Sequence, residues 1–160
     1  MRALLVYDSV FGNTEKVAGA IANALGSGGD VAMVRVDDVK KEQLEGIDLL
    51  VVGSPTRAFR PTPAVAQFLK ELPGEGLRGV KATSFDTRIA PSAVKSGLLR
   101  FIMRLAGYAA KPIAERLARS GAELVAAPEG FFVEDSEGPL KAGELERAGG
   151  WARAIAGAAP

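Results

Sequence analysis

The chain has 160 residues, of which 48% are hydrophobic, a formal net charge of +1 and a pI near 8.0. This size predicts one domain spanning residues 1–160, and the balanced, scattered charge argues against a nucleic-acid partner. Because cysteine and histidine are absent, disulfides, thiolate chemistry, imidazole catalysis and ordinary zinc sites are excluded. We assign no catalytic and no metal-ligating residue from the sequence.

The first element in the chain is an apolar run, Ala3–Tyr7, that predicts a strand buried on both faces. It is too short for a signal peptide or a membrane span, so we expect a cytoplasmic protein. A polar turn, Ser9–Thr14, follows directly. Beyond it, apolar residues between Val17 and Leu25 recur at helical spacing, and Gly26 ends the pattern.

The turn between this strand and helix has the composition of an anion site. The first N–H groups of a helix have no partner within it, and the helix dipole favours negative charge there. Gly12 permits close approach of a ligand, and the side chains of Ser9, Asn13 and Thr14 can hydrogen-bond to phosphate oxygens. The alternative is that Asn13 or Thr14 only caps the helix.

The rest of the chain alternates between strand and helix patterns. Expected strands are Val31–Val36, Leu49–Val52, Val80–Phe85 and Ala122–Ala127. Expected helices are Pro63–Leu72, Ala109–Arg119 and Glu144–Ala156, with a weaker one around Lys40–Leu44. This order predicts an α/β fold, a doubly wound parallel sheet of five strands with helices on both faces.

In such sheets ligands bind beyond the carboxyl ends of the strands. Three loops are therefore candidates for the site: Ser9–Thr14, Ser54–Pro61 and Asp86–Ile89. Two further segments, Ile89–Gly107 and Pro128–Gly143, read as insertions or long loops, which tend to be functional.

The inserted segment near 89–107 is amphipathic and basic. Its cations Lys95, Arg100 and Arg104 fall largely on one side of a helical wheel. Binding to a membrane surface is one interpretation. We favour packing on its own domain, as a lid over the site, or in a homodimer interface.

The segment from Val6 to Ala18 resembles the flavodoxin signature around the phosphate of FMN. Gly53–Arg57 is similar to the second flavin loop of that family, and Phe85–Arg88 lies where the third belongs. The resemblance implies the five-stranded flavodoxin fold and noncovalent FMN. It implies that the phosphate is held by Ser9, Val10, Phe11, Gly12, Asn13 and Thr14. It places Pro55, Thr56, Arg57, Ala58 and Phe59 beside the isoalloxazine, and Asp86, Thr87 and Arg88 at its pyrimidine edge.

Some residues depart from the family pattern. Phe11 stands where flavodoxins commonly have a hydroxyl residue, which removes one side-chain contact to the phosphate. Phe59 is the candidate stacking aromatic, and Tyr108 reaches the site only if its long loop folds back. The glycine-rich third loop of the related quinone reductases is missing from Asp86–Ile89.

The charge near the expected site also differs from that of acidic flavodoxins. Arg57, Arg60 and Arg88 lie on the expected binding loops. A cation at the pyrimidine edge stabilises the anionic reduced flavin, which predicts a less negative potential for the second electron. The alternative is that these arginines pair with Asp86, Glu129 or Glu134, or stay solvated.

We therefore expect an FMN-binding electron carrier that exchanges electrons with a redox partner protein or a small-molecule acceptor. The first alternative is an FMN-dependent NAD(P)H:quinone-type reductase. The second is a flavin-free binding or regulatory module on the same scaffold.

Overall fold

Strands and helices alternate along the chain, and the computed structural model describes them for residues 1–27 and 29–158. The strands are β1 (Arg2–Tyr7), β2 (Asp30–Arg35), β3 (Leu49–Pro55), β4 (Lys81–Ile89), β5 (Glu123–Leu124) and β6 (Glu129–Val133). The helices are α1 (Asn13–Gly26), α2 (Pro63–Glu71), α3 (Gly97–Ala106), α4 (Ala110–Arg119) and α5 (Glu144–Ala158). Short 3-10 turns are η1 (Val36–Asp38), η2 (Lys41–Leu44) and η3 (Pro91–Ala93).

The strands form one parallel sheet in the order β2-β1-β3-β4-β5, with β6 also paired to β4. β5 lies against the start of β4, at Lys81 and Ala82, and β6 lies against its end, from Phe85 to Ile89. The two short strands are therefore halves of one fifth position in the sheet. The predicted α/β fold with a doubly wound sheet is confirmed.

The bounds predicted for the fifth strand are wrong. The apolar run Ala122–Ala127 pairs only at Glu123 and Leu124, and the pairing resumes at Glu129, inside the segment expected to be a loop. Pro128 lies immediately before the second half, and proline has no N–H to donate to a neighbouring strand. The strand is thus interrupted next to a residue that cannot support the ladder.

The predicted end of β4 at Phe85 is also wrong, because the strand continues through Ile89. Asp86 and Thr87 pair with Ser54 and Pro55 on one side and with β6 on the other. Asp86–Ile89 is consequently part of the sheet. Strand pairing on both sides fixes its backbone, and its side chains alternate between the two faces of the sheet.

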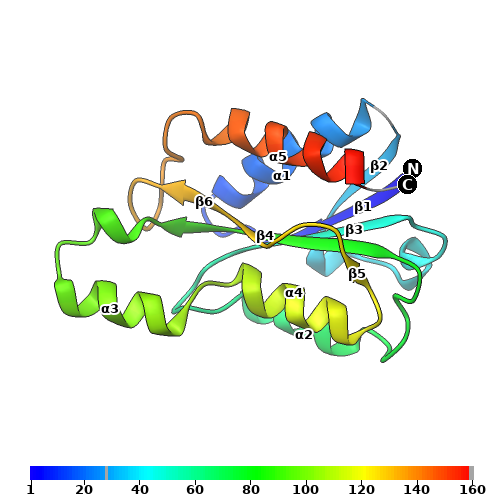
Figure 1. Cartoon of the computed structure of the whole chain (residues 1–160), viewed down its shortest axis with the longest axis horizontal. Helices are drawn as coiled ribbons and strands as arrows, with labels where there is room; N and C mark the ends of the chain where they lie inside the picture. The colour runs from blue at the N-terminus through cyan, green and yellow to red at the C-terminus, as the bar shows by residue number, and fades with distance from the viewer. Residues whose placement is uncertain (28, 159–160) are drawn as a thin grey trace.

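Two helices cover each face of the sheet, α1 and α5 on one and α2 and α4 on the other, as Figure 1 shows. In β1 the side chains alternate: Leu4 and Val6 pack in the core beneath α2 and α4, and Leu5 and Tyr7 pack beneath α1 and α5. Such strict alternation of apolar side chains is what a strand buried on both faces requires.

Two predicted segments take a different form in the structure. The weak helix around Lys40–Leu44 is a single 3-10 turn, and the long segment 89–107 contains η3 and the helix α3. Within the part of the chain that the structure describes, no helix is long and apolar enough to cross a bilayer.

Candidate functional site

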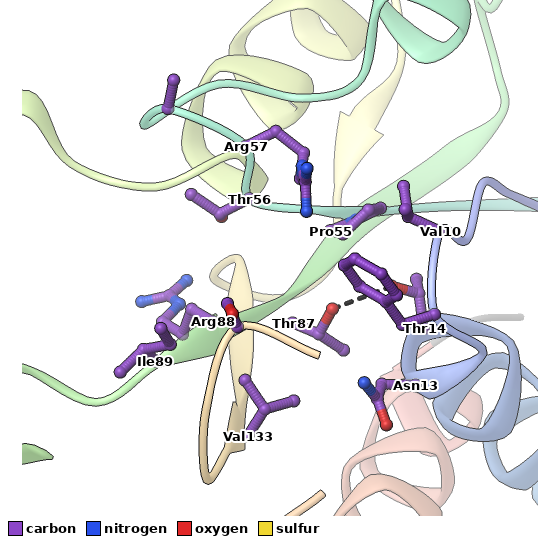
Figure 2. Close-up of a pocket in the computed structure, with 13 residues that line it drawn as sticks. Val10, Asn13, Thr14, Pro55, Thr56, Arg57, Thr87, Arg88, Ile89 and Val133 are labelled. Atoms are coloured by element: carbon purple, nitrogen blue, oxygen red, sulfur yellow. Dashed lines mark hydrogen bonds between the residues drawn. The ribbon is translucent and has the colours of Figure 1, made fainter. Parts of the chain in front are cut away.

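A pocket of about 430 Å³ opens beyond the carboxyl ends of β1, β3 and β4. Its volume falls in the range of about 300–1,000 Å³ typical of small-molecule sites. Figure 2 shows side chains from three separate segments that converge on it: Val10 and Thr14, Pro55 and Arg57, and Thr87. The sheet edge chosen from sequence is therefore where the pocket lies.

Most of the expected site residues line this pocket. They are Val10, Phe11, Asn13, Thr14, Pro55, Thr56, Arg57, Ala58, Thr87 and Arg88. Four expected residues do not line it: Ser9, Gly12, Phe59 and Asp86. Ile89, the end of the candidate loop Asp86–Ile89, also lines it, as do Val133 and Ser136, which were not assigned to the site. The last two belong to the segment 128–143, whose length was the available signal.

The turn before α1 carries backbone N–H groups at the N-terminus of the helix, beside the pocket. Ser9 Oγ accepts hydrogen bonds from the N–H groups of Gly12, at 3.1 Å, and Glu15, at 3.4 Å. Within residues 1–27 and 29–158, the N–H groups of Val10, Phe11, Asn13 and Thr14 donate to no protein acceptor. Unpaired amides at a helix N-terminus form a cradle for an anion.

Gly12 has the backbone conformation that this cradle requires. Its φ of 88° lies in the left-handed region, and a Cβ built there meets no heavy atom within 4 Å. Gly12 is itself the N-cap of α1, and Asn13 and Thr14 are the first two residues of the helix rather than its cap. The alternative that Asn13 or Thr14 serves only as a helix cap is therefore wrong.

The two polar side chains that follow Gly12 connect the turn to distant segments. Thr14 Oγ1 lies 2.8 Å from Thr87 Oγ1, and Asn13 Nδ2 donates to the carbonyl of Glu137 at 3.0 Å. These contacts join the start of α1 to β4 and to the turn after β6. Figure 2 marks the Thr14–Thr87 hydrogen bond with a dashed line across the pocket floor.

The turn after β3 is strained at two consecutive residues. Arg57 and Arg60 exchange backbone hydrogen bonds of 2.8 and 3.0 Å, which closes a tight turn. Ala58 and Phe59 between them have φ values of 46° and 68°. Each such non-glycine residue costs roughly 1–2 kcal/mol. Strain of this kind concentrates at ligand sites, and Ala58 lines the pocket.

Arg57 spans the gap between the first two segments. Its guanidinium carbon lies 5.4 Å from the centroid of the Phe11 ring, and that ring is 44% exposed. This is a cation–π contact. Phe11, the residue that departs from the family pattern, therefore contacts one of the cations expected near the site. Within the described residues, Arg57 and Arg60 form no ion pair.

Arg88 is neutralised by a buried carboxylate. Its Nε and Nη2 atoms donate to Asp86 Oδ1 and Oδ2 at 2.6 and 2.8 Å, and Asp86 is fully buried. Burial raises the pKa of Asp86, and the hydrogen bonds and charge of Arg88 oppose that shift. The alternative in which the expected cation pairs with Asp86 is thus correct for Arg88.

The same carboxylate fixes the start of α4. Ala110 N–H donates to Asp86 Oδ2 at 2.8 Å, and Ala109 N–H donates to Thr56 Oγ1 at 3.0 Å. Tyr108 lies just before them, with its ring 3.8 Å from the Arg88 guanidinium carbon. The long segment therefore folds back to the rim of the pocket, although Tyr108 itself is not part of the lining.

Comparisons with known proteins agree with this architecture. A family model described as a flavodoxin domain matches residues 4–82. An NAD(P)H dehydrogenase (quinone) from Paraburkholderia phymatum is 31% identical over 117 residues, covering 60% of this chain and 59% of that protein. The chain thus matches only about three fifths of the length of this curated relative.

Solved structures extend the likeness to the whole chain. Oxidised flavodoxin 2 from Bacillus cereus has a TM-score of 0.75 and 25% identity, with 98% of this chain and 99% of that chain covered. A flavodoxin from the domain Archaea has a TM-score of 0.71 and 24% identity, with 98% and 97% covered.

The pocket of this chain fits the phosphate-bearing flavin that the family relationship implies. The amides of Val10, Phe11, Asn13 and Thr14, which donate to no acceptor in the described chain, suit an anion. Apolar walls from Pro55, Ile89 and Val133 suit a planar ring. The geometry, the family model and the structural neighbours agree. The chain is therefore flavodoxin-like: residues 4–82 match a flavodoxin domain model, and its fold is that of solved flavodoxins.

Proposed function

We propose that this protein binds FMN in the pocket between α1, β3 and β4 and carries electrons between a reductase and an acceptor. The observation that carries the proposal is that the N–H groups of Val10, Phe11, Asn13 and Thr14 donate to no acceptor among residues 1–27 and 29–158. They lie at one corner of a pocket whose other walls come from two further segments at the same sheet edge. The turn before α1 alone would suit an anion. Together with the turn after β3 and the end of β4, it would suit a ring that carries a phosphate.

The residues divide between two tasks. The amides of the turn and the Thr14 hydroxyl would hold the phosphate, with Thr87 fixing the orientation of that hydroxyl. Pro55–Ala58 and Thr87–Ile89 would border the ring and exclude water from its buried part. When bound, FMN supplies one- and two-electron transfer, while the protein supplies its position and its electrostatic surroundings.

A second candidate function is an FMN-dependent NAD(P)H:quinone-type reductase. The relative from Paraburkholderia phymatum, named for that activity and 31% identical, favours it. Arg57 also lines the pocket and forms no ion pair within the described residues, so it can meet an anionic second substrate. An enzyme of this class oxidises NAD(P)H in the presence of a quinone, and a carrier does not unless its reductase is added.

Flavin binding can be tested directly by titrating FMN into the purified protein and following flavin fluorescence. We expect saturable binding with quenching, and we expect Gly12→Val to abolish it because valine is strained at a φ of 88°. Gly19→Ala is the matched control, since Gly19 lies within α1 and has no heavy atom within 4 Å of a built Cβ. A wild-type protein that takes up no FMN refutes the proposal and leaves the flavin-free module.

The two flavin functions separate in a second assay. NADH or NADPH is mixed with the FMN-loaded protein and a soluble quinone, and the loss of nicotinamide absorbance is followed. Turnover well above that of free FMN assigns the reductase. Its absence, with rapid exchange of electrons once a flavodoxin reductase is added, assigns the carrier.

A further inference from the structure

The helix α3 presents an apolar stripe to solvent. The side chains of Leu98, Phe101 and Leu105 are 71%, 59% and 73% exposed. Those of Leu99 and Ile102 are 41% and 40% exposed. Met103 is the buried residue of this helix and seats it on the rest of the chain. We call Leu98, Leu99, Phe101, Ile102 and Leu105 the α3 apolar face. Its spacing of three and four residues places these side chains along one side of the helix.

The position of α3 excludes two of the roles expected from sequence. No α3 residue lines the pocket, so the helix is not a lid over it, and the apolar face does not pack on its own domain. Figure 1 shows α3 at the edge of the molecule, beyond the arrowhead of β4. Exposed apolar surface gathered in one stripe marks an interaction site.

Cations without partners accompany this face. Between Ile89 and Ala114 the sequence holds Lys95, Arg100, Arg104 and Lys111 and no aspartate or glutamate. Across residues 1–27 and 29–158, none of the four forms an ion pair. The segment between Ile89 and Ala114 thus carries apolar side chains and only positive charges, although the whole chain has a formal net charge of only +1.

We propose that α3 docks on the surface of an anionic phospholipid bilayer. A helix of ten residues is too short to span a bilayer, and it has the form of a helix that lies in the interface plane. Its outermost side chains, Leu98, Phe101 and Leu105, enter the boundary between headgroups and acyl chains. Arg104, beside Phe101 on the helical wheel, reaches the lipid phosphates while its stem remains apolar, and Arg100 lies on the opposite side of the helix.

A second copy of the chain is a poorer occupant. A two-fold interface brings the same surface of both copies together, so α3 pairing with α3 sets the same cations near each other. The segment offers no carboxylate to neutralise them. An anionic bilayer supplies both the apolar interior and the negative charge that this surface lacks.

Docking through α3 also sets the orientation of the pocket. α3 and the pocket both lie beyond the carboxyl end of β4, and the Tyr108 ring that follows α3 stacks on Arg88 at the pocket rim. A bilayer contacted by α3 therefore lies at the same end of the sheet as the pocket. Docking through α3 requires no bound cofactor.

The test is flotation of the purified full chain with vesicles of phosphatidylcholine alone or mixed with phosphatidylglycerol. We expect binding to the anionic vesicles only, weakened by added salt. Replacing Leu98→Ser and Leu105→Ser together lowers the partition coefficient at least about tenfold. Arg104→Gln lowers it about fivefold, and Arg100→Gln lowers it less. The controls are Leu145→Ser and Arg153→Gln in α5, which are exposed and should leave it unchanged.

Circular dichroism and thermal unfolding confirm that the variants fold, and sedimentation velocity gives their masses. Failure to float with anionic vesicles, equal binding to neutral ones, or equal loss with the α5 controls overturns the proposal. A dimer of the wild type that becomes a monomer in the Leu98→Ser and Leu105→Ser variant, without vesicle binding, overturns it in favour of a second copy. Salt-sensitive binding to an acidic protein without vesicle binding overturns it in favour of a protein partner.

Discussion

The hydroxyl oxygens of Thr14 and Thr87 lie 2.8 Å apart, although the two residues are 73 positions apart in the sequence. Thr14 lies in the first turn of α1, at the anion cradle, and Thr87 lies in β4 beside the pocket. Both side chains are buried, and one hydroxyl donates a hydrogen bond to the other. This contact couples the phosphate end of the candidate site to the segment that borders the ring.

Thr87→Val should lower the free energy of unfolding of the cofactor-free protein by about 1 kcal/mol, because it leaves the buried Thr14 hydroxyl without its partner. Urea unfolding measures this. FMN affinity should fall more in Thr14→Val than in Thr87→Val, since only Thr14 is assigned to the phosphate. Equal affinities of the two variants in a fluorescence titration would show that Thr14 does not contact the ligand.

Arg88→Ala should be strongly destabilising, because it leaves the carboxylate of Asp86 buried without its partner. Removal of one partner of a buried ion pair costs about 3–5 kcal/mol. Guanidinium unfolding of the variant measures this cost. Arg78→Ala is the matched control, since its ion pair with Glu75 is exposed and contributes little. A loss no larger than that of the control contradicts the assigned role of the pair.

Arg57→Gln should make the two-electron midpoint potential of the bound flavin more negative. Arg88 is neutralised by Asp86, so Arg57 is the expected cation that both lines the pocket and forms no ion pair in the described chain. The loss of about 1 kcal/mol of Coulomb stabilisation corresponds to roughly 20 mV for a two-electron couple. Potentiometric titration measures the shift. Arg60→Gln, outside the lining, should shift it less, and a positive shift in Arg57→Gln refutes this role.

Stability should fall at acid pH through Glu144, which joins α5 to β6. Its carboxylate accepts hydrogen bonds from Phe132 N–H, at 2.7 Å, and from Arg147 Nη2, also at 2.7 Å. Burial raises the pKa of Glu144, but these hydrogen bonds more than offset it, so the pKa lies below the ordinary 4.5.

Because the folded state binds this proton less tightly than the unfolded chain, the contribution is fully present above about pH 4.5. It is lost as the pH falls through the lowered pKa of the folded state. Urea unfolding across this range should show a flatter pH dependence in Glu144→Gln than in the wild type. The exposed neighbour Glu146, replaced by Gln, should keep the wild-type slope, and identical slopes in all three proteins contradict the prediction.

Local patterns were sufficient to predict the architecture. The strand Ala3–Tyr7, the turn Ser9–Thr14 and the helix after it were predicted because apolar periodicity and a glycine turn are properties of adjacent residues. The parallel direction of the strands followed from the alternation of strands and helices. The position of the pocket followed in turn, since ligands of such sheets bind at the carboxyl edge.

The sequence alone therefore determined the fold class, the family resemblance and the edge of the sheet that carries the pocket. Only the tertiary structure decided that Asp86–Ile89 continues β4, that Asp86 neutralises Arg88, and that the α3 apolar face is exposed. These features depend on which distant residues meet. From sequence alone, polar residues such as Asp86 and Arg88 predict a loop, because their buried partners are not known. Likewise an apolar helix predicts a place in the core, because its neighbours are not known.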